Sequence, residues 1–154
     1  MLRVTAIALL AVLATASKTA VACSCMAFPE DIDKAIAMAF SLADVIFLGS
    51  VQKTQKKMFR YPPARETDFL VKTSWKGLHT DRTKVRSNVG EIACGYEFRK
   101  PGTYLVFAYW DLKGEILTTS FCDLNRREEV AKDAIEALNK VTTPRHTQPP
   151  ADSD

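Results

Sequence analysis

The sequence predicts a mainly β domain, a small antiparallel barrel of five strands with flanking α-helices. Five segments rich in β-branched and aromatic residues follow one another between residues 45 and 121, and turns containing Gly or Pro separate several of them. No helical pattern alternates with these segments, which argues against a parallel α/β sheet. Two amphipathic helical patterns lie before and after the strands, so we expect both helices to pack against the barrel.

The first 22 residues match a secretory signal peptide in all three of its parts. Arg3 gives a short basic region, residues 6–16 form an apolar run, and Ala20-Val21-Ala22 is a small-x-small cleavage site. The apolar run of about 11 residues is too short for a membrane span, which needs about 20. We therefore expect export, to the extracellular space or the periplasm, and a mature chain that begins at Cys23.

The same cleavage region also approximates a bacterial lipobox, whose cysteine would be acylated and would anchor the chain to a membrane. Lys18 lies in the stretch before Cys23, and position 20 is Ala rather than Leu. Both features argue against acylation, so a lipid anchor at Cys23 is the alternative to a free amino terminus.

The mature chain is short and nearly neutral. Cleavage after Ala22 removes 22 of the 154 residues and leaves 132, enough for one domain and too few for two. It also removes Arg3 and Lys18, so 19 Lys and Arg face 18 Asp and Glu and the net charge is about +1. Such a balance gives no strong field toward nucleic acid or anionic lipid. We expect neither as a partner, and we expect a monomer.

Four cysteines, Cys23, Cys25, Cys94 and Cys122, form an even set in a chain that we expect to enter an oxidising compartment. Two disulfides are therefore favoured over a metal site or a redox pair. In an extended segment the side chains of Cys23 and Cys25 point the same way about 6.5 Å apart, beyond usual disulfide geometry. Each should reach a distant partner, in either of the two remaining pairings, and fasten the amino-terminal segment at two neighbouring points.

The first expected element is a helix over residues 30–42, with Asp31 and Asp33 in its first turn, where the helix dipole favours acidic side chains. An apolar strand at residues 45–48 follows, and Gly49 indicates a bulge or kink. The apolar face of the helix consists of Ile32, Ile36, Ala39 and Phe40.

Four more strands are expected. The segment 104–110 is apolar throughout, which is typical of a strand buried on both faces. A turn containing Gly114 joins it to the next strand as a hairpin. The expected strands are residues 69–75, 84–89, 104–110 and 116–121, and the first of them places Phe69, Val71, Thr73 and Trp75 on one face.

A second helix is expected after residue 125. Asn125, followed three residues later by Glu128, resembles an N-terminal capping pair. The domain then spans residues 23–140, and the polar, proline-containing tail 141–154 should be disordered because it has nothing apolar to bury. The apolar stripe of this helix is Val130, Ala134, Ile135 and Leu138.

Five motifs occur in a set order along the mature chain. They are Cys23-Ser24-Cys25, residues 43–49, Trp75-Lys76-Gly77, Cys94-Gly95-Tyr96 and residues 118–122. Together they resemble the netrin-like module, and most closely the amino-terminal domain of the tissue inhibitors of metalloproteinases (TIMPs). The resemblance implies an OB-fold-like five-stranded Greek-key barrel in a short, single-domain member. It also implies the disulfides Cys23–Cys94 and Cys25–Cys122.

The resemblance further implies inhibition of zinc metalloproteases. In that family the backbone amine and carbonyl oxygen of the first cysteine chelate the protease zinc at its open position, a role that would fall to Cys23. Ser24 would point toward the specificity pocket of the protease, with Met26 as a neighbouring contact. The implied inhibitory ridge comprises Cys23, Ser24, Cys25, Met26, Ala93 and Cys94.

Other classes of function find less support in the sequence. A resident tetrahedral metal site needs four ligands, and the two histidines, His79 and His146, lie in a turn and in the tail. There is no Gly-x-Ser-x-Gly, no Cys and His pair in a plausible context and no Gly-rich phosphate loop. We therefore expect neither an enzyme nor a cofactor.

The main rival to inhibition is a secreted or lipid-anchored netrin-like binding module. Residues 53–65 mix Lys and Arg with Phe59 and Tyr61, as surfaces that bind single-stranded nucleic acid do. Export and the near-neutral charge argue against nucleic acid. We interpret the segment as a long polar hairpin loop between the first two strands, a common place for partner contacts.

Overall fold

The computed structural model describes residues 23–58, 63–89 and 94–146. The expected signal peptide and Ala93 lie outside these residues. The elements are α2 (Ile32–Leu42), β1 (Val45–Lys57), β2 (Ala64–Lys76), β3 (Arg82–Asn88), β4 (Thr103–Trp110), β5 (Leu117–Thr118), β6 (Arg126–Arg127), the short 3₁₀ helix η2 (Glu128–Val130), α3 (Lys132–Val141) and β7 (Arg145–His146).

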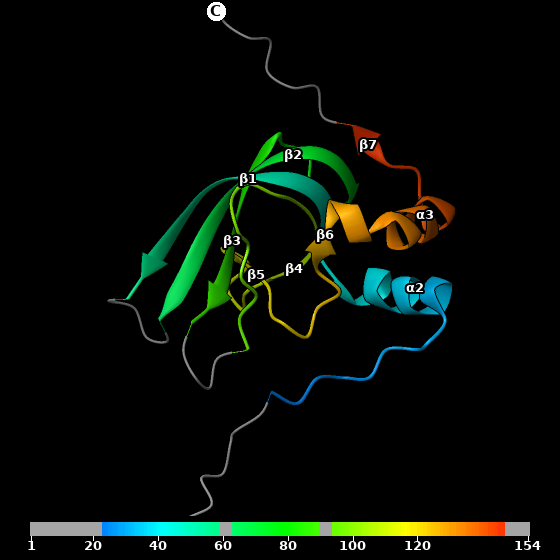
Figure 1. The fold of residues 1–154 in the computed structure, drawn as a ribbon, viewed down its shortest axis with the longest axis horizontal. Helices are drawn as coiled ribbons and strands as arrows, with labels where there is room; N and C mark the ends of the chain where they lie inside the picture. Colours follow the sequence, from blue (N-terminus) through cyan, green and yellow to red (C-terminus); the bar gives the residue numbers. More distant parts are fainter. Residues whose placement is uncertain (1–22, 59–62, 90–93, 147–154) are drawn as a thin grey trace, which may run out of the picture.

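Five strands form a sheet that closes on itself, and α2 and α3 lie together on one side of it (Figure 1). β1 pairs with β2, β2 with β3, and β4 with both β1 and β5, all antiparallel. The ring is completed by β3 and β5, which pair in parallel. An odd number of strands cannot alternate in direction around a closed ring, so one parallel pair is unavoidable. The mainly β, closed five-strand prediction is confirmed, whereas the expectation of an entirely antiparallel barrel is wrong.

β1 continues well beyond the short strand expected at residues 45–48. Its pairing with β2 shifts register at Leu48/Gly49, as expected for a bulge at Gly49, and again at Val51/Lys53. A Cβ at position 49 would lie 2.9 Å from the Phe47 ring, so glycine leaves room for that ring.

The stretch expected as a long polar loop is therefore mostly strand. Lys53, Lys56 and Lys57 lie on β1 and Arg65 lies on β2, while Phe59 and Tyr61 fall outside the described residues. Cross-strand polar pairs stabilise this hairpin in place of apolar alternation, among them Thr54 with Thr67 (3.4 Å between hydroxyl oxygens) and Lys57 with Glu66 (4.0 Å).

The core has two parts, one on each face of the paired strands β1 and β4. On β4, Tyr104 and Val106 face the barrel interior, and Leu105 and Phe107 face the helices. The expectation that this strand is buried on both faces is confirmed. The barrel interior includes Phe47, Phe69, Val85, Phe98 and Val106. The layer between sheet and helices includes Ile36, Ile46, Leu105, Phe107 and Leu138.

α2 agrees with its prediction, except that it begins at Ile32 because Asp31 is the cap. The Asp31 carboxylate accepts a hydrogen bond from the backbone N–H of Lys34 at 2.9 Å. An ion pair between Asp33 and Lys140 (3.0 Å) joins α2 to α3. Within the described part of the chain, every helix is too short or too polar to cross a bilayer.

α3 departs from its prediction at its start. It begins at Lys132, and Asn125 does not cap it, because η2 intervenes and the Asn125 side chain is turned toward β4. Val130 belongs to η2 and is 67% exposed, so its assignment to the apolar stripe is wrong. The tighter winding of a 3₁₀ helix puts Val130 out of phase with the stripe that follows. Ala134 and Leu138 are fully buried as expected.

The expectation of disorder from residue 141 onward is wrong as far as His146. Val141 ends α3, and β7 pairs with β2 at Thr73 and Ser74. The Thr73 hydroxyl lies 3.3 Å from Nδ1 of His146, and Arg145 contacts His79. The prediction considered only apolar burial, whereas backbone hydrogen bonds to an open strand edge hold this segment.

Gly77, directly after β2, needs to be glycine for two reasons. Its φ is +74°, and a Cβ there would lie 2.2 Å from the backbone oxygen of Asp44. Gly114 has a φ of +70°, but a Cβ there would meet nothing within 4 Å.

We expect Gly77→Ala to lower the free energy of unfolding by more than about 3 kcal/mol and Gly114→Ala by about 1 kcal/mol. Denaturant unfolding of both variants measures the difference, and equal losses would show that contact with Asp44 does not set the cost.

Candidate functional site

The amino-terminal segment of the described chain is an exposed strip without helix or strand. Cys23, Ser24, Cys25, Met26 and Ala27 are all exposed, and Met26 retains 53% of its accessible surface. The chain turns inward only at Phe28, which packs against the core layer beneath the helices.

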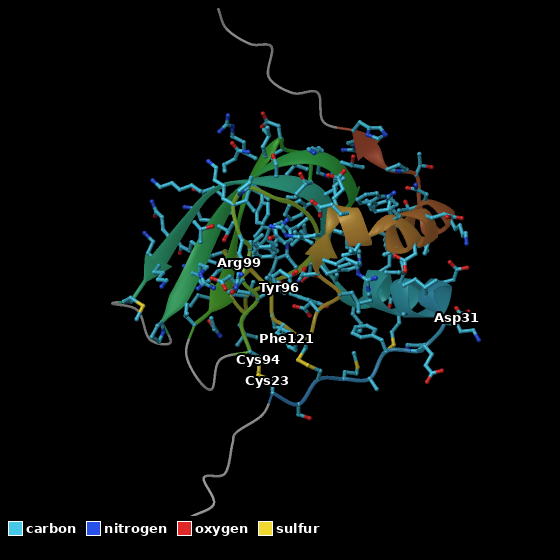
Figure 2. The ribbon with its side chains drawn as sticks, viewed as in Figure 1. Cys23, Asp31, Cys94, Tyr96, Arg99 and Phe121 are labelled. Carbon is cyan, nitrogen blue, oxygen red and sulfur yellow. A yellow bond between two sulfur atoms is a disulfide. The ribbon has the colours of Figure 1, made fainter. Side chains whose placement is uncertain are left out.

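Two disulfides hold this strip against the barrel. Cys23 is bonded to Cys94 and Cys25 to Cys122, with Cα–Cα distances of 5.8 and 5.1 Å. The disulfide prediction is confirmed, in the pairing that the resemblance implies. The backbone N–H of Phe121 donates to the carbonyl oxygen of Cys94 at 2.6 Å, so the two anchoring segments also contact each other. Figure 2 shows Cys23, Cys94 and Phe121 close together at one end of the barrel.

The Cys94 segment is held in place by its close approach to β3. A Cβ at Gly95 would lie 1.7 Å from the carbonyl oxygen of Asn88, so only glycine fits there. The hydroxyl of Ser87 donates to the carbonyl oxygen of Tyr96 at 2.6 Å, and burial raises the pKa of the Tyr96 phenol. The close approach to Asn88 explains why glycine follows Cys94.

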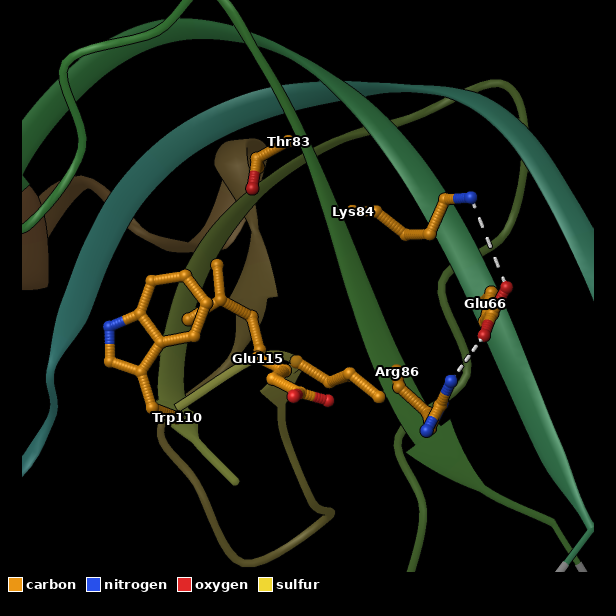
Figure 3. A pocket seen from close by; sticks show the side chains of 8 residues that line it. Glu66, Thr83, Lys84, Arg86, Trp110 and Glu115 are labelled. Atoms are coloured by element: carbon orange, nitrogen blue, oxygen red, sulfur yellow. Dashed lines mark hydrogen bonds and ion pairs between the residues drawn. The ribbon is translucent and has the colours of Figure 1, made fainter. Parts of the chain in front are cut away.

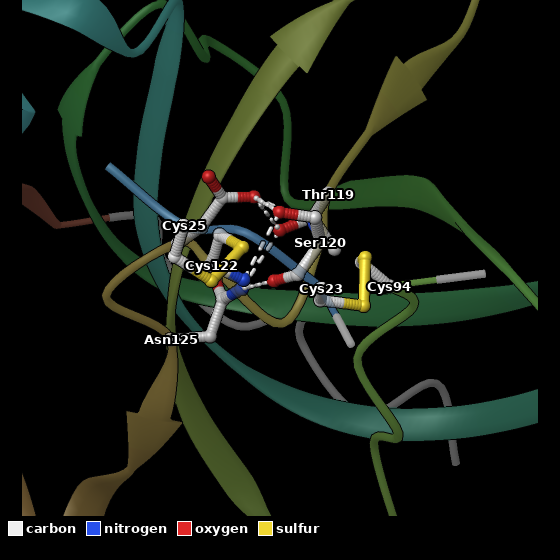
Figure 4. Close-up of a disulfide and its surroundings, with 8 residues drawn as sticks. Cys23, Cys25, Cys94, Thr119, Ser120, Cys122 and Asn125 are labelled. Atoms are coloured by element: carbon white, nitrogen blue, oxygen red, sulfur yellow. Dashed lines mark hydrogen bonds between the residues drawn. A yellow bond between two sulfur atoms is a disulfide. The ribbon is translucent and has the colours of Figure 1, made fainter. Parts of the chain in front are cut away.

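The Cys122 segment is held by a compact polar turn (Figure 4). The Asp123 carboxylate accepts hydrogen bonds from the backbone N–H and the hydroxyl of Ser120, at 2.6 and 3.0 Å. The Ser120 hydroxyl in turn accepts from the backbone N–H of Cys122 at 3.2 Å. The hydroxyl of Thr119 lies 3.0 Å from the same Asp123 oxygen. The turn therefore fixes the backbone on both sides of Cys122, the half-cystine of the second disulfide that this segment carries.

Asn125 connects this turn to the core. Its side-chain oxygen accepts from the backbone N–H of Phe107 at 2.8 Å, and its amide nitrogen donates to the Thr119 hydroxyl and the Ser120 carbonyl, at 2.7 and 3.1 Å. The Asn125 side chain is buried, which makes these bonds costly to lose. The Asn125 side chain thus accepts the hydrogen bond that a neighbouring strand would otherwise accept from the Phe107 N–H of β4.

We expect Asn125→Ala to destabilise the domain by about 1–3 kcal/mol, because it leaves the buried N–H of Phe107 without an acceptor. It should also loosen the turn that carries Cys122. Ser41→Ala is the matched control, since the Ser41 hydroxyl is exposed and donates to the carbonyl of Met38 within the same helix, so its loss should cost less than about 0.5 kcal/mol. Equal unfolding midpoints for the two variants would contradict this role of Asn125.

Tyr109 lies beside the same turn. Burial, and then the negative charge of Asp123, raise the pKa of Tyr109 to about 12. The phenol therefore stays protonated at physiological pH.

The structure brings together five of the six residues of the implied ridge, Cys23, Ser24, Cys25, Met26 and Cys94, and Ala93 lies outside the described residues. Sequence reasoning missed Phe121, a residue that is 66% exposed and lies beside both disulfides. The only signal for it was its position directly before Cys122. Thr119, Ser120, Asp123 and Asn125 were also missed as supports, although such short polar residues are typical of turns.

A cavity of about 260 Å³ lies elsewhere, lined by residues of β2, β3, β4 and β5 (Figure 3). Its Glu66 carboxylate accepts a hydrogen bond from the Arg86 guanidinium at 2.6 Å and lies 3.9 Å from the Lys84 ammonium. The Arg86 bond, followed by the attraction of both cations, lowers the pKa of Glu66. Glu66 is thus an ionised partner in an ion-pair network, which is not the environment of a general acid.

Within residues 23–58, 63–89 and 94–146, no three His, Cys, Asp or Glu side chains are grouped so that they could hold a metal ion. The four cysteines are all committed to disulfides. No protein-family model matches the sequence, and neither does any curated protein.

Proposed function

We propose that the chain is a short, single-domain netrin-like protein of the TIMP type, with an OB-type barrel. The closed ring of five strands with helices on one side supports this assignment. So do the two long-range disulfides that start from cysteines two positions apart. The module is exported, and its mature form begins at Cys23.

The proposed activity is inhibition of a zinc metalloprotease through the backbone of Cys23. The amine and the carbonyl oxygen of this residue take up the open position of the protease zinc and displace its water. An amine binds metal only when neutral, and an α-amino group with a pKa of about 7.7–8.0 loses its proton at little cost near physiological pH. The thiol of Cys23 takes no part, because it is bonded to Cys94.

The observation that carries this proposal is the exposure of Cys23 and Ser24 in a segment that two disulfides tie to the barrel. Cys23 and Ser24 are exposed, while disulfides at positions 23 and 25 restrain the backbone on both sides of Ser24. A preorganised segment loses little conformational entropy when it binds, so chelation costs less than it would for a free tail.

Side chains next to the chelating atoms would set the choice of protease. Ser24 is small and fills little of an apolar specificity pocket. Met26 and Phe121 are the large exposed apolar side chains beside it, at 53% and 66% exposure, and they supply most of the apolar contact area.

The direct test is titration of a panel of matrix-type metalloproteases with mature protein whose terminus and disulfides have been verified by mass spectrometry. We expect stoichiometric inhibition of at least one protease in the panel. Inhibition of none, by protein with a free Cys23 amine and both disulfides, would favour the alternative, a secreted or lipid-anchored binding module without protease inhibition.

A further inference from the structure

The outer half of β1 has an open edge. β4 covers β1 only from Val45 to Ser50, and one more backbone hydrogen bond follows, from Val51 to Gly102 at 2.9 Å. From there to Lys57, β1 pairs with β2 on one side, and no other strand of the described residues pairs with it on the other. Figure 1 shows this part of β1 at the margin of the sheet. Backbone N–H and C=O groups at such an edge are a template for a further strand.

A groove of about 640 Å³ is lined by four residues of β1 between Gln52 and Lys56, by Arg65 of β2 and by the segment 97–100. Its lining includes Phe98, which is buried, and Lys100, whose ammonium donates to the carbonyl oxygen of Gln52 at 2.9 Å. The groove therefore lies along the length of strand that has no neighbour.

The groove is strongly basic. Glu97 is its one acidic residue, and its carboxylate is held by Arg65 and Arg99 at 3.2 and 3.1 Å. The hydrogen bond from Arg99, and then the charge of Arg65, lower the pKa of Glu97, so it remains ionised. Within the described residues, neither the Lys53 nor the Lys56 ammonium lies within 4.0 Å of a carboxylate oxygen. The basic residues that line the groove are Lys53, Lys56, Arg65, Arg99 and Lys100.

The near-neutral net charge of the mature chain does not show the local excess of basic residues around the groove. The described residues between 50 and 100 contain 11 Lys and Arg against four Asp and Glu. The described residues 23–44 and 123–141, which carry the helices, contain five against nine. The net charge of the mature chain therefore does not describe the charge of this region, because opposite charges are gathered at different parts of the fold.

We propose that the groove binds an extended acidic peptide segment, which adds as a strand to the open edge of β1. Backbone hydrogen bonds to residues 53–57 would supply affinity, and Lys53 and Lys56 would select acidic side chains. This site does not depend on zinc chelation by Cys23.

The open edge favours a peptide over other polyanions. Nucleic acids and sulfated polysaccharides are negatively charged and would be attracted to the basic groove, but they have no alternating N–H and C=O groups to pair with a strand. Single-stranded nucleic acid also uses exposed aromatic faces for stacking, and Phe98, the aromatic residue among those described that line this groove, is only 3% exposed.

Lysines on an edge strand can also serve only to prevent unwanted strand pairing. Lys53 and Lys56 are three residues apart in a regularly paired part of β1, so their side chains lie on opposite faces of the strand. The probe that separates the two roles is therefore a peptide of about eight residues made of Glu and Thr, with Glu on both of its faces and with blocked termini, long enough to follow β1 from Lys53 to Lys57. We expect it to bind the oxidised mature chain and to slow hydrogen exchange of β1 edge amides. The same peptide with N-methyl groups on alternate residues should bind at least about tenfold more weakly.

Equal binding of the methylated and unmethylated peptides would overturn strand addition and leave attraction by charge alone. No binding of either peptide would show that the lysines serve only to prevent unwanted strand pairing at this edge. Tighter binding of an oligonucleotide or a sulfated polysaccharide at this groove than of the peptide would overturn the choice of partner.

Charge reversal tests the same site from the protein side. The double variant Lys53→Glu, Lys56→Glu should weaken peptide binding at least about tenfold. Lys113→Glu, an exposed change in the turn after β4, is the control and should leave affinity within about twofold. Both variants should unfold close to the wild-type midpoint. Equal affinity of the double variant and the control would overturn the assignment.

Discussion

Retention of Ala22 in front of Cys23 is expected to abolish metalloprotease inhibition while leaving the domain folded. An additional residue converts the terminal amine into an amide nitrogen, which has no lone pair available for zinc. The extra residue would also extend from an exposed strip into the space that the protease must occupy. We expect the inhibition constant to rise more than about a hundredfold, a loss of about 3 kcal/mol. The measurement is parallel titration of one sensitive protease with the processed and the extended proteins.

Acetylation of the Cys23 amine is the chemical counterpart of that change and should have the same effect. The two disulfides and the unfolding midpoint should be unaffected in both forms, because neither change touches Cys94, Cys25 or Cys122. Equal potency of the processed and extended proteins would refute chelation through Cys23, whatever other surface carried the inhibition.

Removal of the Cys25–Cys122 bridge by Cys25→Ser and Cys122→Ser is expected to lower the free energy of unfolding by about 3–4 kcal/mol. Its closing cysteines are separated by 97 residues, but Cys23–Cys94 already ties the terminus down. The shortest covalent loop that the second bridge closes therefore runs mainly from Cys94 to Cys122, about 30 residues. In the chain-entropy model a loop of this length gives about 3–4 kcal/mol, less than the roughly 4.7 kcal/mol of a loop of about 100 residues.

A loss of this size is a large part of the whole stability of a typical domain, about 5–15 kcal/mol, and should lower Tm by more than about 10 °C. Calorimetry or denaturant unfolding measures it. Ser24→Ala is the control, because Ser24 lies between the two half-cystines without taking part in either bridge. An unchanged Tm in the double serine variant would show that this bridge does not constrain the chain.

Elements with a strong local pattern were predictable from the sequence. The uninterrupted apolar run of β4 indicated burial on both faces, and Ile36 and Ala39 in α2 are buried as their helical spacing requires. The extent of β1 was not predictable in the same way. Beyond Val51 it is polar, and cross-strand pairs with β2, rather than an apolar face, keep it extended.

Asn125 shows the limit of local patterns at the candidate site. Its spacing from Glu128 is that of a helix cap, but the side chain satisfies the N–H of Phe107, 18 residues earlier in the chain. A spacing rule covers neighbours within one or two turns, and so it cannot detect a backbone donor that another element leaves unpaired.

By itself the sequence determined the β class, the burial of the central strand and the presence of two disulfides, because apolar periodicity and cysteine number are properties of the chain itself. The motifs of the resemblance added the pairing. Only the tertiary structure decided which polar groups meet: the turn that supports Cys122, the capture of β7 by β2, and the basic groove beside an open strand edge. Each depends on contacts between residues far apart in sequence, and the geometry of such contacts exists only after the sheet has closed.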